Sequence, residues 1–167
     1  MNENPSLTCP HAMRREGEKW LPVSNETASA FRVDVVLDYG LAADTYSISE
    51  STGGSVSFGL GAGTQNGNRN YILLGSVTGT SPGTPLPGGM AVLPINFDLF
   101  TSVMIDLMGT PIFNGFMGTL DPEGASSAVL DTLGPVSGTA GLTLYFAYAL
   151  NTPWDYASNP VAISIIP

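Results

Sequence analysis

Residues 160–166, PVAISII, show the alternation that decides the fold class. Val161, Ile163 and Ile165 fall on one face of an extended chain, because successive side chains of a strand point to opposite faces. The residues between them are mixed in polarity, so we expect the second face to be half exposed to water. The pattern predicts a β-strand with one face in a hydrophobic core.

Short runs of the same kind recur along the chain and are separated by Gly, Pro, Asn and Asp. The 167 residues include 20 Gly and 13 Pro and only 11% are charged, which indicates frequent turns and few exposed helices. The other predicted strands cover residues 31–37, 45–49, 55–60, 70–77, 90–95, 114–120, 125–131 and 141–150. We therefore predict an all-β, antiparallel β-sandwich, jelly-roll or Ig-like, of eight to nine strands.

Residues 97–111 depart from this pattern and predict one short helix. Asp98 can cap its start and Gly109 can end it. Methionine side chains adapt to irregular surroundings, so Met104 and Met108 are candidate ligand-binding residues, on a lid over the core edge or on the floor of an apolar pocket. The apolar residues at helical spacing are Phe100, Val103, Met104, Leu107 and Met108.

Two loops have a clear physical interpretation. Residues 121–124, DPEG, place Pro and Gly where a tight turn needs them, and they predict a hairpin between the flanking strands. Residues 81–89, SPGTPLPGG, contain three prolines, which lack an amide proton. We expect this second loop to stay out of any sheet and to connect the two sheets.

The first thirty residues differ from the rest and predict an N-terminal extension, residues 1–30, before a single domain, residues 31–167. They contain three of the five basic residues, the only histidine and the only cysteine. One cysteine, Cys9, excludes an internal disulfide and a multi-cysteine metal site. No signal peptide and no apolar run long enough for a transmembrane helix is visible in the sequence.

The formal net charge is −9, and Arg69 is the only base after residue 32. A surface this poor in cations cannot neutralise phosphates, so the sequence disfavours binding to nucleic acid and to anionic membranes. Cationic ligands, calcium above all, remain possible partners.

Four segments resemble a module found near the C-terminus of many large exported proteins of planctomycetes and similar environmental bacteria. The resemblance covers about residues 42–167. It implies an extracellular or cell-surface β-rich appendage, attached to other domains, whose own role is not established. The segments are DTYSISESTGGSVSFGLGA at 44–62, NYILLGSVTGTSPG at 70–83, GTLD at 118–121 and YASNPV at 156–161.

Residues 151–156, NTPWDY, place two large aromatic side chains beside a carboxylate in a loop before the last strand. Trp154 and Tyr156 are candidate ligand-binding residues, because aromatic loops form sugar platforms in carbohydrate-binding sandwiches. The alternative is that both rings close the end of the sandwich.

Nucleophilic catalysis with a histidine base would depend on His11, the only histidine. Its neighbour Cys9 is too close in sequence to meet it in a useful geometry. Residues 59–63, GLGAG, are followed by polar turn residues and not by a helix, so a nucleotide-binding loop is not predicted.

The carboxylates are the remaining source of chemistry. Calcium takes six to eight oxygen ligands, and loops of exported sandwiches often supply them. No spacing in this chain matches a defined calcium loop, and solvated turn acids are the alternative interpretation. The candidate metal ligands are Asp34, Asp38, Asp44, Asp121, Glu123 and Asp131.

Two functions follow from these observations. The first is a non-catalytic extracellular accessory module that binds a small molecule, a glycan or a protein, or that associates with itself through a sheet edge. The second is a calcium-dependent hydrolase of small esters or lactones, such as acyl-homoserine lactones. In this second hypothesis calcium polarises the carbonyl, Asp121 or Asp155 directs water, and the methionine-rich helix holds the acyl chain.

Overall fold

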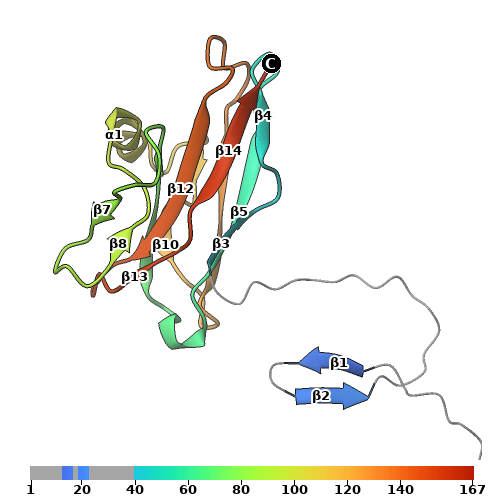
Figure 1. Cartoon of the computed structure of the whole chain (residues 1–167), viewed down its shortest axis with the longest axis vertical. Helices are drawn as coiled ribbons and strands as arrows, with labels where there is room; N and C mark the ends of the chain where they lie inside the picture. The colour runs from blue at the N-terminus through green and yellow to red at the C-terminus, as the bar shows by residue number, and fades with distance from the viewer. Residues whose placement is uncertain (1–12, 17–18, 23–39) are drawn as a thin grey trace, which may run out of the picture. The chain divides into compact units, whose positions relative to one another are not determined.

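The computed structural model describes residues 13–16, 19–22 and 40–167 (Figure 1). The chain forms two compact units, Met1–Val35 and Val36–Pro167. In the first unit β1 (Met13–Glu16) and β2 (Lys19–Pro22) pair antiparallel. The strand predicted at 31–37 lies outside the described residues.

The second unit is built mostly of strands with one α-helix, which confirms the all-β class. The predicted runs 55–60, 70–77, 125–131 and 141–150 form strands within a few residues of the expected bounds, and run 90–95 forms only two strand residues. The strands are β3 (Gly40–Ala43), β4 (Ser47–Ser49), β5 (Ser55–Gly61), β6 (Asn70–Ser76), β7 (Thr84–Pro85), β8 (Val92–Leu93), β9 (Phe113–Asn114), β10 (Met117–Thr119), β11 (Ala125–Asp131), β12 (Thr143–Leu150), β13 (Tyr156–Ala157) and β14 (Val161–Ile166).

The strands form two main sheets. The large sheet has the order β10-β6-β12-β14-β4, with β13 also paired to β12, and the small sheet has the order β3-β5-β11-β9. Strands β4 and β14 pair in parallel, whereas the other pairings within these sheets are antiparallel. The large sheet is therefore mixed, and the chain passes from β3 in the small sheet directly into β4 at the edge of the large one.

The two sheets share one hydrophobic core. Alternate residues of β5, among them Phe58, are buried while their neighbours are exposed. The Phe58 ring lies 5.0 Å from the ring of Phe146 on β12, centroid to centroid, which joins the two sheets. Phe116 packs edge-on against both rings. Burying three such aromatic side chains removes several hundred square ångströms of apolar surface from water, on the order of 150–250 Å² for each ring.

The outer face of β12 is also covered. Ala147 and Ala149 are fully buried beneath a ribbon formed by β7 and β8, together with Leu86, Leu93 and Ile95. The prediction that residues 81–89 join no sheet is wrong, since Thr84 and Pro85 pair with β8. A two-residue edge strand tolerates proline because it needs few amide donors.

The turn predicted at 121–124 is confirmed, but the prediction of a hairpin is wrong, because the flanking strands do not pair with each other. The Gly124 amide donates to the Asp121 carbonyl, and Gly124 has a φ of +81°. A side chain at Gly124 would also collide with the Gly63 carbonyl. The turn nevertheless connects β10 in the large sheet to β11 in the small sheet, because each strand pairs with other partners.

The predicted helix is present as α1 (Leu99–Asp106) and begins at Asp98 as expected. The Asp98 carboxylate accepts the Thr101 amide, and the Thr101 hydroxyl accepts the Asp98 amide, which makes a capping box. The Thr101 hydroxyl also donates to the Gly75 carbonyl at 2.7 Å, which fixes the helix over the end of β6. No helix in the described residues is long and apolar enough to cross a membrane.

Asp98 ties this helix to the end of the large sheet. Its Oδ2 atom accepts hydrogen bonds from the Ser76 hydroxyl and from the amides of Val77 and Thr78, all within 3.0 Å. Partial burial acts to raise the pKa of Asp98, but the hydrogen bonds from Thr101, Ser76, Val77 and Thr78 outweigh it and hold the pKa well below its ordinary value.

We expect Asp98→Ala to lower the free energy of unfolding by about 2 kcal/mol, because it removes a helix cap and leaves several donors unpaired. Urea denaturation followed by circular dichroism measures this change. Asp106→Ala is the matched control on the same helix: Asp106 is exposed at the helix end, where a negative charge is slightly unfavourable. Equal stability of the two variants would contradict the role given to Asp98.

Candidate functional site

A cavity of about 300 Å³ lies between the two sheets, at the end where β12 begins. Both sheets, the start of α1 and the loop before β12 contribute to its wall. Only two of the lining side chains carry a polar group. The lining residues are Ile48, Val77, Phe100, Ile112, Phe113, Leu130, Thr132, Val136, Thr139, Leu142, Leu144 and Ile165.

The two polar side chains of this inter-sheet cavity are already paired within the protein. The Thr139 hydroxyl donates to the Val136 carbonyl, and the Thr132 hydroxyl accepts the Gly54 amide at 2.9 Å. The cavity wall therefore offers apolar contact, and a ligand group inside it needs to be apolar as well.

Residues 132–142, here named the cover loop, close one side of the cavity. Four of the lining residues belong to it, and Glu50 holds it in place. Glu50 Oε1 accepts the backbone amides of Gly138, Thr139 and Ala140 at 2.6, 2.9 and 3.1 Å. The Glu50 carbonyl accepts the amide of Val136 as well. One residue thus fixes both the middle and the far part of the cover loop.

The hydrogen bonds to Glu50 stabilise its charged form. The amides of Ala140, Gly138 and Thr139 lower its pKa from the ordinary 4.5, against a smaller opposing effect of burial. Because the pKa in the folded protein lies below that of the unfolded chain, this contribution to stability is complete above about 4.5 and is lost as the pH falls through the lowered value.

We expect Glu50→Gln to remove this part of the acid sensitivity, because glutamine keeps an oxygen for the three amides but does not titrate. The measurement is the urea midpoint of wild type and variant from neutral pH to below 4.5. Glu123→Gln is the control, since Glu123 is exposed and accepts no hydrogen bond among the described residues. Parallel pH profiles for wild type and Glu50→Gln would contradict this role.

The cavity opens to solvent beside α1 and the cover loop. Val77 and Leu142 line the cavity and still keep 39% and 45% of their surface exposed. The mouth is thus bordered by apolar side chains that water reaches, and a ligand that covers them gains hydrophobic stabilisation.

The two candidate methionines of α1 do not line this cavity. Met104 is completely buried in the shared core, and Met108 packs against that core. The helix residue that reaches the cavity is Phe100, which packs edge-on against Phe113 and Phe146. Sequence reasoning therefore found the right helix but not the residue of it that faces the cavity.

Trp154 and Tyr156 lie at the opposite end of β12. Trp154 is half buried and lines a smaller cavity of about 170 Å³ beneath the β7–β8 ribbon. Tyr156 lies beside Tyr148, with 3.4 Å between the two hydroxyl oxygens. Burial and then the contact with Tyr156 raise the pKa of Tyr148 far above its ordinary value. Both candidate rings are thus packed against the protein along much of their surface.

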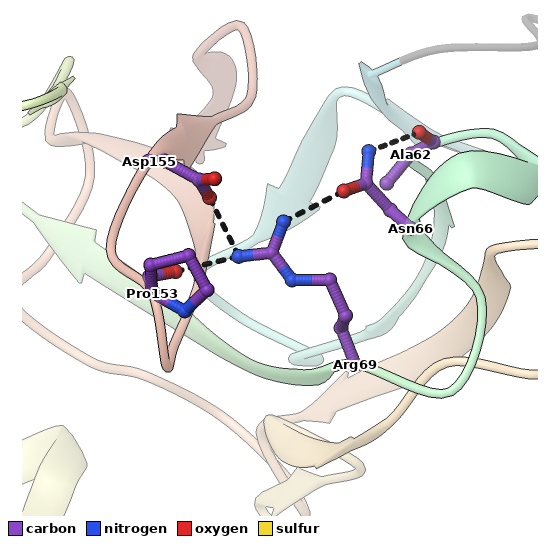
Figure 2. Close-up of polar contacts among 5 residues, drawn as sticks. All are labelled: Ala62, Asn66, Arg69, Pro153 and Asp155. Carbon is purple, nitrogen blue, oxygen red and sulfur yellow. Dashed lines mark hydrogen bonds and ion pairs between the residues drawn. The ribbon is translucent and has the colours of Figure 1, made fainter.

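The candidate acid Asp155 takes part in a polar network at this same end (Figure 2). The Arg69 guanidinium lies between Asn66 and the loop before β13. It donates to Asp155 at 2.6 Å, to Asn66 at 2.7 Å and to the Pro153 carbonyl. Asn66 in turn donates to the Ala62 carbonyl. Residues 40–167 contain no base other than Arg69. Asp155 is therefore the only acid among these residues that has a basic partner from the same part of the chain.

The other candidate acids are spread over the unit. Asp121 accepts the Ala125 amide, Asp131 accepts the Leu133 amide and Asp44 accepts the Ser57 amide. Among the described residues no group of three or more His, Cys, Asp or Glu side chains lies together as a metal site would need. Asp34 and Asp38 lie outside the described residues.

The candidate catalytic acids and the cavity lie at opposite ends of the strands. Asp121 and Asp155 come after strand ends that pair with the first residues of β6, so both lie near the start of β6. The cavity lies near the other end of β6, where Val77 follows the strand. Strand β6 has seven residues, so the two ends are about 20 Å apart.

Residues 79–83, GTSPG, match the Gly-x-Ser-x-Gly spelling of a nucleophile elbow. They lie in the loop between β6 and β7, and a strand follows them where the elbow needs a helix. Residues 40–167 also contain no histidine to act as a base. The match therefore does not support a serine hydrolase.

Comparison of the chain with protein-family models, with curated proteins and with solved structures finds no match. The cavity and its surroundings are therefore the basis for a functional proposal.

Proposed function

We propose that the second unit is a non-catalytic binding module that takes an apolar small molecule in the inter-sheet cavity. The observation that carries the proposal is the cavity of about 300 Å³ whose wall has no unpaired polar side chain. An apolar cavity of about half this volume is enough to bind benzene. A ligand segment on the order of ten carbon atoms would fit by the same measure.

The same observation favours a small molecule over a glycan. Sugars need several polar partners in addition to an aromatic platform. Trp154 faces a small cavity whose wall is formed mainly by Ile, Leu, Pro and Ala side chains. We further propose an extracellular or cell-surface location, which is supported by the resemblance of residues 42–167 to a module of exported bacterial proteins.

We expect Val136→Phe to weaken binding of 1-decanol at least about tenfold, because the larger ring fills the cavity. Isothermal titration calorimetry measures the affinity. Val92→Phe is the matched control, since Val92 is 53% exposed and lies outside the cavity. Thermal unfolding of both variants separates loss of the cavity from loss of the fold.

Two results would contradict the proposal. One is the absence of any decanol binding by the wild-type protein. The other is unchanged binding by a folded Val136→Phe variant, which would place the decanol elsewhere on the protein.

A calcium-dependent hydrolase of esters or lactones is the second candidate, because the cavity would also hold the acyl chain of such a substrate. In the binding module we expect no turnover of short esters or acyl lactones, with calcium or with a chelator, since Asp121 and Asp155 lie about 20 Å from the cavity. Calcium-dependent turnover that Asp121→Asn or Asp155→Asn abolishes would establish the hydrolase instead. Asp106→Asn is the control for the loss of one carboxylate, because Asp106 is exposed and is not among the candidate calcium ligands.

A further inference from the structure

Two carboxylates are hydrogen-bonded to the backbone of residues that line the inter-sheet cavity. Glu50 accepts the amide of Thr139, which lines the cavity. Asp98 accepts the amide of Val77, which forms the mouth. Asp131 does not belong with them, because it alternates along β11 with the cavity-lining Leu130 and pairs with the exposed Ser55, so its side chain lies on the outer face of the small sheet. The cavity therefore has two negative charges beside it at neutral pH.

No base of the unit balances these charges. Residues 40–167, which the structure describes throughout, contain one base, Arg69. Its guanidinium is bound to Asp155 at the other end of the strands (Figure 2). An anionic group at the cavity mouth would therefore meet two carboxylates and no cation of this unit.

Resting on the proposed function, we propose that the ligand is a single-chain amphiphile with a cationic head, an alkylammonium, and that the cavity discriminates against fatty-acid anions. The alkyl chain occupies the apolar cavity, and the charged head stays in water at the mouth, where its desolvation cost is small. The two carboxylates attract a cation there and repel an anion.

One of the two carboxylates keeps an oxygen atom available to such a head. The hydrogen bonds to the Glu50 side chain go to Oε1. Among the described residues, none donates a hydrogen bond to Glu50 Oε2. Asp98 differs, because donors surround both of its oxygens. Glu50 can therefore accept from an ammonium group, whereas Asp98 contributes only its negative charge.

Three ten-carbon probes that differ in the head group test the proposal on the wild-type protein: decylamine, 1-decanol and decanoate. We expect calorimetry at neutral pH to give the order decylamine, decanol, decanoate from tightest to weakest. We expect decylamine to bind at least about tenfold more tightly than decanoate. This difference in affinity should decrease as salt is added, because salt screens the charges.

The outcomes separate this inference from the function on which it rests. Binding of all three probes with equal affinity would overturn the inference and leave the apolar binding module in place. Tighter binding of decanoate than of decylamine would also overturn it. A failure of all three probes to bind would overturn both.

A conservative variant locates the effect at the mouth. In Glu50→Gln the new amide keeps the oxygen that the backbone amides need, so the fold is preserved. We expect decylamine to lose several-fold in affinity and decanol to be unchanged. Asp121→Asn removes a charge at the opposite end, and we expect it to change neither affinity. An equal loss in Asp121→Asn would show that only the net charge matters, which would overturn the inference.

Discussion

Strand β12 is buried on both faces, and the rest of the second unit is arranged around this constraint. Its inner face packs through Phe146 onto the small sheet, and its outer face needs the β7–β8 ribbon to cover Ala147 and Ala149. Alanine on the outer face lets the ribbon approach closely, whereas the inner aromatic rings set the separation of the two sheets. The inter-sheet cavity lies where this row of rings ends, near Leu144, and where smaller aliphatic side chains leave space.

The elements with a strong local signal could be predicted from the sequence. Strand β11 has the predicted bounds, and β14 buries Val161, Ile163 and Ile165 as the alternation indicates. The helix start at Asp98 was predicted because capping depends on residues within one turn. Strands such as β3, β9 and β13 have only two to four residues, and their existence depends on pairing with distant strands. Such pairing leaves little trace in the local sequence.

The partners of each element, and with them the candidate site, could not be predicted. The DPEG turn has the same local chemistry whether it joins paired strands or crosses between sheets, so the sequence suggested a hairpin that does not exist. The cavity is formed by residues from many elements, each of which looks like an ordinary core residue. Leu142, for example, simply continues the alternation of Leu144 and Phe146 in the strand predicted at 141–150. The role of Glu50 depends on amides almost 90 residues away and has no local signal.

The pairing of β14 with both β12 and β4 has a consequence for how the protein is made. The two strands at the centre of the large sheet, β12 and β14, come from residues 143–166, whereas β4 and β6 precede them by far in the chain. During translation the small sheet therefore emerges with the inner face of β5 uncovered. Contacts this distant in sequence form slowly, and exposed apolar strands aggregate. The apolar inner face of β5 therefore stays uncovered until β12 and β14 pair with the earlier strands.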